Sequence, residues 1–393
     1  MGDDLAAALD AFLARHEREL IELRRDLHAH PEPANAERRT TQVVAERLAR
    51  AGLRPVLFSG TTGLRADIGP DKPRIALRAD LDALPMDDEK SVPYRSVIPG
   101  FCHACGHDAH TAMLVGAGLF LAELAATRAL PRGVRLIFQP AEETASGAKE
   151  VIAAGALDGV SEIFALHCDP RLDVGKVGIR AGAITAACDK VRVTLAGPGG
   201  HTARPHLTAD VVYALGKVVT EVPAALTRRV DPRAGLSLVW GHVNAGTTAN
   251  AIPDGGIVEG TLRCLDAEVW RSAMVLIEDL VQSVAAPYGV IAKVEYLSAV
   301  PPTVNEVTSA ALIAGAAAAA LGPGAVTDAA QSLGGEDFAW YLEMVPGAMA
   351  RIGTRTPGAA AEGDLHQPVF DIDERAIGTG VRVLAAVAVA AGA

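Results

Sequence analysis

The sequence predicts an α/β protein, with a mainly parallel sheet flanked by helices and a smaller α+β domain inserted into it. Short apolar runs alternate with helical patterns through the first half of the chain, which is typical of parallel strands joined by helices. From about Asp189 onward the strand-like segments alternate polar and apolar residues instead, as half-exposed strands do. After residue 300 an Ala-rich helical pattern resumes the larger domain. We therefore expect one domain over residues 1–187 and 300–393, and an inserted domain over residues 188–299.

Apolar periodicity places the elements of the larger domain. Side chains at helical spacing predict helices at residues 5–27, 40–51, 109–126, 146–154 and 310–321, and a last helix from about residue 374. Continuous apolar runs predict three buried strands, at residues 74–78, 134–138 and 162–166. Because these strands alternate with helices, we expect them to lie in one mainly parallel sheet.

The inserted domain has a separate set of elements. Strand-like segments lie at residues 191–195, 236–239, 256–263 and 292–296. Helical patterns lie at residues 210–222 and 268–286. This combination predicts a small α+β unit.

The composition describes a large globular protein and excludes several classes. Half of the 393 residues are hydrophobic, which is enough for a core and argues against disorder. The net charge of −11 argues against partners such as nucleic acid or an anionic membrane. Five cysteines in so long a chain do not form a disulfide framework. The N-terminus is acidic and the most apolar run, residues 383–393, is too short to span a bilayer, so we expect a cytoplasmic location.

Polar side chains of the kinds that bind metals or move protons follow all three predicted strands. Asp80 and Asp82 follow the first strand, Glu142 and Glu143 the second, and His167 the third. In open α/β sheets, ligands bind outside the carboxyl ends of the strands. Surface charge would explain any one of these groups, but each follows a buried apolar run. If the strands are neighbours, we expect the groups to converge on one polar site.

The densest group of such side chains is the segment 102–110, Cys-His-Ala-Cys-Gly-His-Asp-Ala-His, which precedes an apolar helix. Thiolate, imidazole and carboxylate are the natural ligands of zinc and its neighbours in the transition series. A metal site is our first interpretation, a Cys–His nucleophile the second, and buried structural histidines the third. A structural zinc site would require a second cysteine pair, but Cys168, Cys188 and Cys264 stand alone.

The adjacent glutamates fit the metal interpretation. Side chains one residue apart on an extended segment point in opposite directions. Glu143 can therefore bind metal while Glu142 faces the substrate as a general base. Water activated by a metal needs such a partner to accept its proton.

Six segments resemble the signatures of the M20 metallopeptidase family. Within that family they are similar to the amidohydrolase branch of hippurate hydrolases, indole-acetyl-amino-acid hydrolases and aminoacylase-like enzymes. The segments are residues 77–85 (LRADLDALP), 103–110 (HACGHDAH), 138–143 (FQPAEE), 199–206 (GGHTARPH), 250–254 (NAIPD) and 365–368 (LHQP). The resemblance implies a zinc-exopeptidase-like fold, in which the inserted domain serves dimerisation or acts as a lid.

The resemblance also implies which residues bind the metals. Those that fall on the ligands of the family's dinuclear site are Cys105, His107, Glu143, His167 and His366. The Cys105 thiolate stands where other branches use a bridging aspartate. Other branches begin with a His-x-Asp motif, whereas this chain has Arg78-Ala79-Asp80-Leu81-Asp82. Either Asp80 or Asp82 takes the supporting role, and Asp80 is our candidate for a catalytic residue.

Four further residues have implied roles in catalysis or substrate binding. Glu142 falls on the general base. His201 falls on the histidine that reaches across a dimer interface to stabilise the oxyanion. Asn250 and Arg263 fall where the family binds the free carboxylate of the substrate.

The resemblance implies metal-dependent hydrolysis of the amide bond of an N-acyl amino acid or a related conjugate. Two divalent ions per subunit are implied, zinc first, with manganese, cobalt or nickel as alternatives. We also expect a homodimer through the inserted domain. Three alternatives remain open: a dipeptidase or carboxypeptidase on the same scaffold, a non-catalytic binding protein for a metal or small molecule, and a thiol hydrolase that uses Cys105.

Overall fold

The computed structural model describes residues 2–70, 74–359 and 363–391, and the chain divides into two units. The larger unit comprises Met1–Gly182, Asn305–Ala330 and Trp340–Ala393, and the inserted unit comprises Ala183–Val304 and Gln331–Ala339. The unit boundaries thus fall at 182/183 and 304/305, where the sequence suggested 187/188 and 299/300. We expected the segment 331–339 in the larger domain, but it belongs to the inserted unit. It is hydrogen-bonded to that unit, because the Ala186 amide donates to the Ser332 carbonyl at 3.0 Å.

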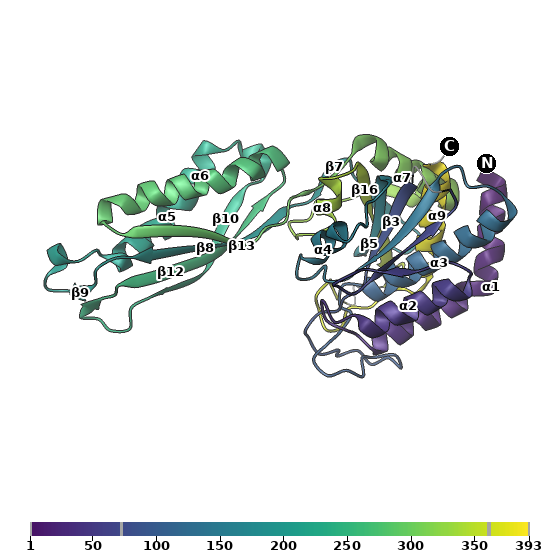
Figure 1. The fold of residues 1–393 in the computed structure, drawn as a ribbon, viewed down its shortest axis with the longest axis horizontal. Coiled ribbons are helices and arrows are strands. Elements are labelled where there is room, and N and C mark those ends of the chain that lie inside the picture. The colour runs from purple at the N-terminus through teal and green to yellow at the C-terminus, as the bar shows by residue number, and fades with distance from the viewer. Residues whose placement is uncertain (1, 71–73, 360–362, 392–393) are drawn as a thin grey trace. The chain divides into compact units, whose positions relative to one another are not determined.

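An eight-stranded sheet forms the centre of the larger unit, in the order β1-β2-β4-β3-β5-β16-β6-β15 (Figure 1). The strands are β1 (Val56–Leu57), β2 (Leu64–Ile68), β3 (Arg74–Asp80), β4 (Gly133–Gln139), β5 (Val160–Asp173), β6 (Val177–Ile179), β15 (Val326–Asp328) and β16 (Gly347–Arg355). The four central strands β4, β3, β5 and β16 are parallel. Antiparallel pairs occur toward the edges, between β2 and β4 and between β16 and β6. The expected mainly parallel sheet is therefore present.

The sequence analysis missed β16, a central and almost fully buried strand. Its apolar run is interrupted by glycines, Thr354 and Arg351, and Arg351 is nevertheless only 6% exposed. An arginine within a run normally argues against a buried strand. The strand is recognisable only from its tertiary partner, β5, with which it pairs from Gly347 to Arg355.

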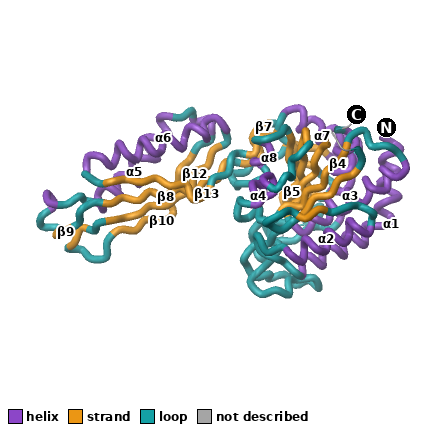
Figure 2. The backbone as a smooth tube through the Cα atoms, in the orientation of Figure 1, coloured by secondary structure: helices purple, strands orange, loops and turns teal. Residues whose placement is uncertain are grey.

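Helices cover both faces of this sheet (Figures 1 and 2). They are α1 (Gly2–Ala29), α2 (Arg38–Arg50), α3 (His107–Thr127), α4 (Gly147–Ala153), α7 (Val307–Leu321), α8 (Ala339–Leu342) and α9 (Arg375–Ala390), with the short 3-10 helix η4 (Pro323–Ala325). Helix α3 packs against α1, α2 and α9, whereas α4 lies across the sheet from α3. Helix α3 is long and apolar enough to cross a membrane by length and composition, but 67% of its most apolar window is buried in the protein, as in the core helix of a globular domain.

The inserted unit contains a four-stranded antiparallel sheet, in the order β10-β12-β8-β13, with α5 and α6 packed on it (Figure 2). Its elements are β8 (Ala187–Ala196), α5 (Val211–Arg229), β10 (Ser237–Ala245), β12 (Gly255–Cys264), α6 (Ala267–Ala285) and β13 (Ile291–Ser298). Two small sheets pair β9 (Gly200–His201) with β11 (Ala251–Ile252), and β7 (Gly182–Thr185) with β14 (Thr303–Asn305). The remaining short 3-10 helices are η1 (Pro205–Leu207), η2 (Pro232–Ala234) and η3 (Ala286–Tyr288). Along β8, buried residues alternate with more exposed ones, because only one face of the sheet carries helices.

Candidate metal centre

The site forms at one edge of the central sheet of the larger unit. Strands β3 and β4 end there, and the neighbouring strand β5 continues past them. Strands β3 and β4 are parallel and finish side by side, with Asp80 paired to Gln139. On the other side of β3, pairing with β5 stops at Arg78 and Ala165. His167 therefore lies just beyond this edge. We expected β5 to end at His167, but it continues to Asp173 because β16 keeps pairing with it.

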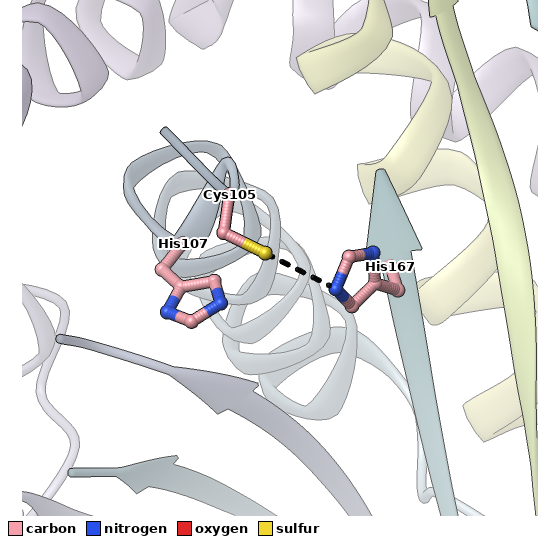
Figure 3. Close-up of side chains that lie close together, drawn as sticks. All are labelled: Cys105, His107 and His167. Atoms are coloured by element: carbon pink, nitrogen blue, oxygen red, sulfur yellow. Dashed lines mark hydrogen bonds between the residues drawn. The ribbon is translucent and has the colours of Figure 1, made fainter. Parts of the chain in front are cut away.

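Helix α3 begins at the same edge, and its start supplies two more side chains, His107 on its first residue and Cys105 just before it. Gly106 precedes it with φ of 86°, and a β-carbon there would lie 2.8 Å from Cys168 Sγ, so this position requires glycine. The tight turn places Cys105 and His107 side by side and directs the Cys105 sulfur toward His167 on β5, as Figure 3 shows. Cys105 Sγ lies 3.5 Å from His167 Nε2. Ligand atoms of Cys105, His107 and His167 all lie within 4.8 Å of one another.

The two glutamates follow β4 in a tight turn. Both oxygens of the Asp82 carboxylate accept backbone amides there, from Glu142 at 3.1 Å and from Glu143 at 2.9 Å. Glu143 Oε1 lies 3.8 Å from His107 Nε2 and 3.5 Å from His366 Nε2. Glu142 Oε2 lies 3.9 Å from the same His107 nitrogen. The turn therefore directs both carboxylates to the ligand histidines.

His366 comes from a loop far along the chain. Its φ is 62°, in the left-handed region that few residues other than glycine adopt. Its amide donates to the carbonyl of Ala104 at 2.8 Å, which ties this loop to the segment that carries Cys105. Ligand atoms of Cys105, Glu143 and His366 also lie within 4.8 Å of one another. All five residues predicted to bind metal thus lie in one cluster.

The donor set fits divalent metal ions. His107 Nδ1 donates to the Asp82 carbonyl at 2.9 Å, which leaves Nε2 as the ligand nitrogen. This Nε2 and Glu143 Oε1 are buried and have no hydrogen-bond partner within the described residues. Burial and the Glu143 carboxylate raise the pKa of the Cys105 thiol, and burial raises the pKa of Glu143 to about 7. Divalent cations would supply the positive charge that keeps a thiolate and a carboxylate ionised here.

The same environment argues against Cys105 as a nucleophile. A reactive cysteine needs a lowered thiol pKa, usually from a neighbouring cation. Burial and Glu143 instead raise the pKa of Cys105 well above its usual value. His167, its neighbour, donates Nδ1 to the Cys168 carbonyl at 2.8 Å, and burial together with Arg351 lowers its pKa. A neutral imidazole beside a buried thiol suits metal binding better than proton abstraction.

The two aspartates of β3 have different partners. Asp80 accepts hydrogen bonds from His110 Nδ1 and Arg78 Nη1, each at 2.6 Å. Burial opposes its ionisation, but His107, His110 and Arg78 hold the pKa of its carboxyl well below the usual value. Asp82 instead contacts the ligand His107 and the glutamate turn. Asp82 therefore has the more direct contacts for the supporting role, and a catalytic role for Asp80 stays a prediction.

The remaining predicted residues lie in the inserted unit. His201 on β9 pairs with Ala251 on β11, next to Asn250, so these two residues lie close together and both are exposed. His201 Nδ1 accepts the amide of Ala203 at 3.0 Å. Arg263 lies near the far end of β12, paired with Cys188 at the start of β8.

The length of β12 separates Arg263 from the other two residues. Gly255, at the opposite end of β12, pairs with Ala196 at the end of β8 that leads to β9. Eight residue steps of ~3.3 Å place Arg263 about 26 Å from Gly255. Within one subunit, therefore, Asn250 and Arg263 do not meet, and the role of each at the carboxylate of the substrate stays a prediction.

Comparison with known proteins identifies the family. Residues 76–390 match Peptidase family M20/M25/M40. The chain belongs to this family. It is 38% identical to the N-acetyl-L-cysteine deacetylase of Bacillus subtilis over 367 residues, which cover 93% of the chain and 86% of that relative. It is 39% identical to a probable hydrolase of Synechocystis, covering 93% of each. A relative from Rhodococcus jostii, named putative glutamate–cysteine ligase 2-3, is 52% identical over 372 residues, but the chain spans only 46% of its length.

Solved structures of M20 proteins agree with this assignment. The YXEP protein of Bacillus subtilis, described as a dinuclear metal binding peptidase from the M20 family, has a TM-score of 0.83 and 34% identity, covering 98% of this chain and 99% of that one. A putative aminohydrolase of Staphylococcus aureus has a TM-score of 0.91 and 29% identity, covering 98% of each. The predicted family, fold class and enzyme class, a metal-dependent amidohydrolase, are confirmed.

Hydrogen bonds show which residues support this M20 site. Arg78 and His110 hold Asp80, and His110 also accepts the Cys168 amide at 2.8 Å. The signal for a supporting role of His110 was its place in the segment 102–110, three residues after His107 on the same face of α3. Glu37, whose carboxylate reaches the glutamate turn, offered none, because it lies more than a hundred residues away in sequence.

Proposed function

We propose that this protein hydrolyses the amide bond of N-acyl amino acids at a dinuclear metal site. The observation that carries the proposal is a pair of buried atoms, His107 Nε2 and Glu143 Oε1, that have no hydrogen-bond partner among the described residues and lie close to Cys105, His167 and His366. Relatives named N-acetyl-L-cysteine deacetylase and IAA-amino acid hydrolase, 38% and 32% identical, support an N-acyl amino acid as substrate.

The five clustered residues would hold two divalent ions, with Cys105 between the two halves of the cluster. When bound, such ions polarise the scissile carbonyl and lower the pKa of the attacking water. A thiolate ligand favours zinc, and manganese, cobalt and nickel are the alternatives for a mixed set of nitrogen, oxygen and sulfur donors.

Glu142 is the proposed general base. Its carboxylate adjoins the ligand cluster, and its backbone is fixed by Asp82. The side chain is 8% exposed, so it is held within the protein while still accessible from the site. Glu142 would accept a proton from the attacking water at a carboxylate oxygen and return it to the departing amine.

Arg263 is the proposed partner of the substrate carboxylate. Its Nη1 is buried and has no hydrogen-bond acceptor among the residues the structure describes. A guanidinium with an unused donor suits a planar carboxylate. His201 would donate to the oxyanion of the tetrahedral intermediate, and Asn250 lies beside it.

The distance along β12 supports a homodimer. A small substrate that contacts Arg263 cannot also contact His201 and Asn250 of the same inserted unit. A second copy of the chain would supply the missing residues. The edge strand β10 suits such an association, because Val239 and Val243 are 62% and 51% exposed on it. We further propose a cytoplasmic enzyme without nucleic-acid or membrane partners, consistent with the net charge of −11.

Substitution of Glu142 tests the function. Glu142→Gln keeps the shape of the side chain but removes the base, so we expect turnover to fall about 10³-fold. Zinc content, measured by plasma mass spectrometry, should be unchanged because Glu142 is not a proposed ligand. Turnover is measured on a panel of N-acyl amino acids and dipeptides, and preference for dipeptides would favour a peptidase.

Chelation provides the control for this experiment. A chelator should abolish activity, and added Zn²⁺, Mn²⁺ or Co²⁺ should restore it. A thiol hydrolase would behave differently, because alkylation of Cys105 would inactivate it while chelation would not. Wild-type turnover by Glu142→Gln would refute the mechanism, and absence of turnover on every substrate by the metal-loaded wild type would favour a binding protein.

A further inference from the structure

The turn that carries Glu142 and Glu143 is held in a disfavoured backbone conformation. Ala141 has φ of 54°, in the left-handed region that glycine adopts easily and residues with a β-carbon do not. Ala141 is fully buried, and its carbonyl accepts the amides of Ser146 and Gly147. A strained residue persists only where its surroundings hold it.

Two buried carboxylates hold this turn. The amides of three consecutive residues, 141 to 143, all donate to carboxylate oxygens. Asp82 accepts the second and third of these hydrogen bonds, as described above. Glu37 accepts the first, from Ala141, at 2.8 Å. The directions of the Glu142 and Glu143 side chains therefore depend on both acids.

Glu37 makes this contact from the loop between α1 and α2. Its side chain is 0% exposed, and the oxygen that accepts the Ala141 amide also accepts the Asn35 amide at 3.0 Å. Its other oxygen accepts the Thr62 hydroxyl. Glu37 immediately precedes α2, yet its side chain makes no capping hydrogen bond to that helix. Glu32 satisfies the first amides of α2 instead, those of Arg39 at 3.0 Å and Thr40 at 2.8 Å.

We propose that Glu37 is a positioning residue for the metal site, which acts by holding Ala141 in its left-handed conformation. It contacts neither the proposed ligands nor the substrate; it fixes the turn from which Glu143 reaches the metals and Glu142 reaches the water. The inference rests on the proposed function, because it assumes those two roles. It assigns to the loop between α1 and α2 a part in a site formed more than a hundred residues later in the sequence.

The role of Glu37 depends on an acceptor oxygen rather than on a negative charge. Burial raises the pKa of its carboxyl, so ionisation is disfavoured there. A glutamine can satisfy the same partners, since its carbonyl oxygen accepts the two amides and its amino group donates to Thr62 Oγ1. Glu37→Gln should therefore keep the turn in place, whereas Glu37→Ala should release it.

The experiment compares zinc affinity and turnover of these variants. For Glu37→Ala we expect zinc affinity, measured by competition with a chromophoric chelator, to fall about 10- to 100-fold, as for other residues that orient metal ligands. We expect kcat to fall by a similar factor and KM to change by less than about threefold, because substrate contacts remain. Glu37→Gln should stay within about threefold of wild type in both quantities. If Glu37→Ala does not fold, Glu37→Asp, which shortens the reach by one methylene, replaces it with the same expectation.

Glu32→Ala is the matched control, because it removes a carboxylate from the same loop that caps α2 without touching the turn. It should lower the melting temperature but leave zinc affinity and kcat unchanged. If Glu37→Ala lowers only the melting temperature, as Glu32→Ala does, Glu37 is merely structural and the inference is wrong. Zinc affinity is measured without turnover, so failure of this inference can be distinguished from failure of the proposed function. An active Glu142→Gln would refute the function, whereas unchanged zinc affinity in Glu37→Ala would refute the inference.

A second substitution tests the conformational step itself. Glycine adopts positive φ without strain, so Ala141→Gly in the Glu37→Ala background should recover part of the lost zinc affinity and turnover. A structural role of Glu37 in anchoring α2 predicts no recovery. Absence of any recovery would overturn the proposed route through Ala141.

Discussion

The two units hold their candidate residues in different ways. In the larger unit Cys105, Glu142 and His167 are at most 8% exposed and lie among hydrogen-bonded partners. In the inserted unit His201 and Asn250 are exposed, His201 on the short strand β9 and Asn250 just before its partner β11, beside a cavity of about 620 Å³. Buried groups with several partners are fixed before substrate arrives, whereas exposed groups on short strands can adjust to it.

This difference separates two tasks. The larger unit holds charged side chains in its interior, and their burial costs desolvation energy. Ion pairs between buried carboxylates and arginines offset part of that cost. In the proposed function, the inserted unit would only present a few donors to a substrate. Substitutions in the inserted unit should therefore change turnover or KM without changing metal binding.

Among substitutions in the inserted unit, the largest effect is expected for His201. Removal of a donor to the oxyanion typically costs about 10²- to 10³-fold in kcat, so His201→Ala should lose turnover by this factor with unchanged zinc affinity. Mixing His201→Ala with Glu142→Gln tests whether the histidine serves the partner subunit. Mixed dimers would contain one complete site, and random exchange would restore about a quarter of wild-type activity.

His206→Ala is the control for this substitution, because His206 is a second exposed histidine on the same loop. It should change kcat by less than about threefold. A mixture that stays inactive, although subunit exchange is verified with differently tagged chains, would break the proposed sharing of sites. Loss of zinc from His201→Ala would contradict the separation of tasks between the two units.

A smaller effect is expected for Arg263. Arg263→Met removes the proposed contact with the substrate carboxylate, so KM for N-acyl amino acids should rise about 10- to 100-fold while kcat changes less. Substrates whose carboxylate is amidated should be affected little. Arg192→Met is the matched control, since Arg192 lies on the same sheet and pairs with Glu259. Equal loss on charged and amidated substrates would mean that Arg263 does not bind the carboxylate.

The candidate ligands were predictable because their signals are local. Glu143 follows the apolar strand β4, His167 follows the apolar run within β5, and Cys105 and His107 lie at the start of an apolar helix. Sheet topology then brings the strand ends together without further information. The resemblance to M20 signatures supplied His366, for which no local pattern of strand or helix existed.

The supporting residues were not predictable because their signals are tertiary. Glu37 matters only through the amide of Ala141, and Arg351 is buried only because β16 lies between β5 and β6. The separation of Asn250 from Arg263 follows from the pairing of β12 with β8. The order of the motifs along the chain does not reveal these contacts and distances, because they arise only when the strands pair.

The smallest effect concerns a buried charge network that distinguishes the larger unit from the inserted unit. Arg24, fully buried in α1, donates to Asp108 and to Asp371, each at 2.7 Å. His28 Nδ1 lies 2.7 Å from Asp108, and its Nε2 lies 3.2 Å from Asp88. Because Asp108 follows the proposed ligand His107 at the start of α3, this network anchors the helix end that carries His107 and follows Cys105.

Protonation of His28 should make this anchor sensitive to pH. Burial lowers the pKa of His28 and Arg24 opposes its charge, but Asp108 and Asp88 outweigh both and raise the pKa to about 10. A histidine whose pKa is raised on folding stabilises the protein fully below the unfolded value of about 6.5, and this contribution is lost as pH rises toward 10. The free energy of unfolding, measured with urea, should therefore fall over this range by an amount on the order of 3 kcal/mol. His28→Gln should be less stable than wild type at pH 6 and approach it at pH 10. A difference between the two proteins that is constant over this range would show that His28 is not charged in the folded state.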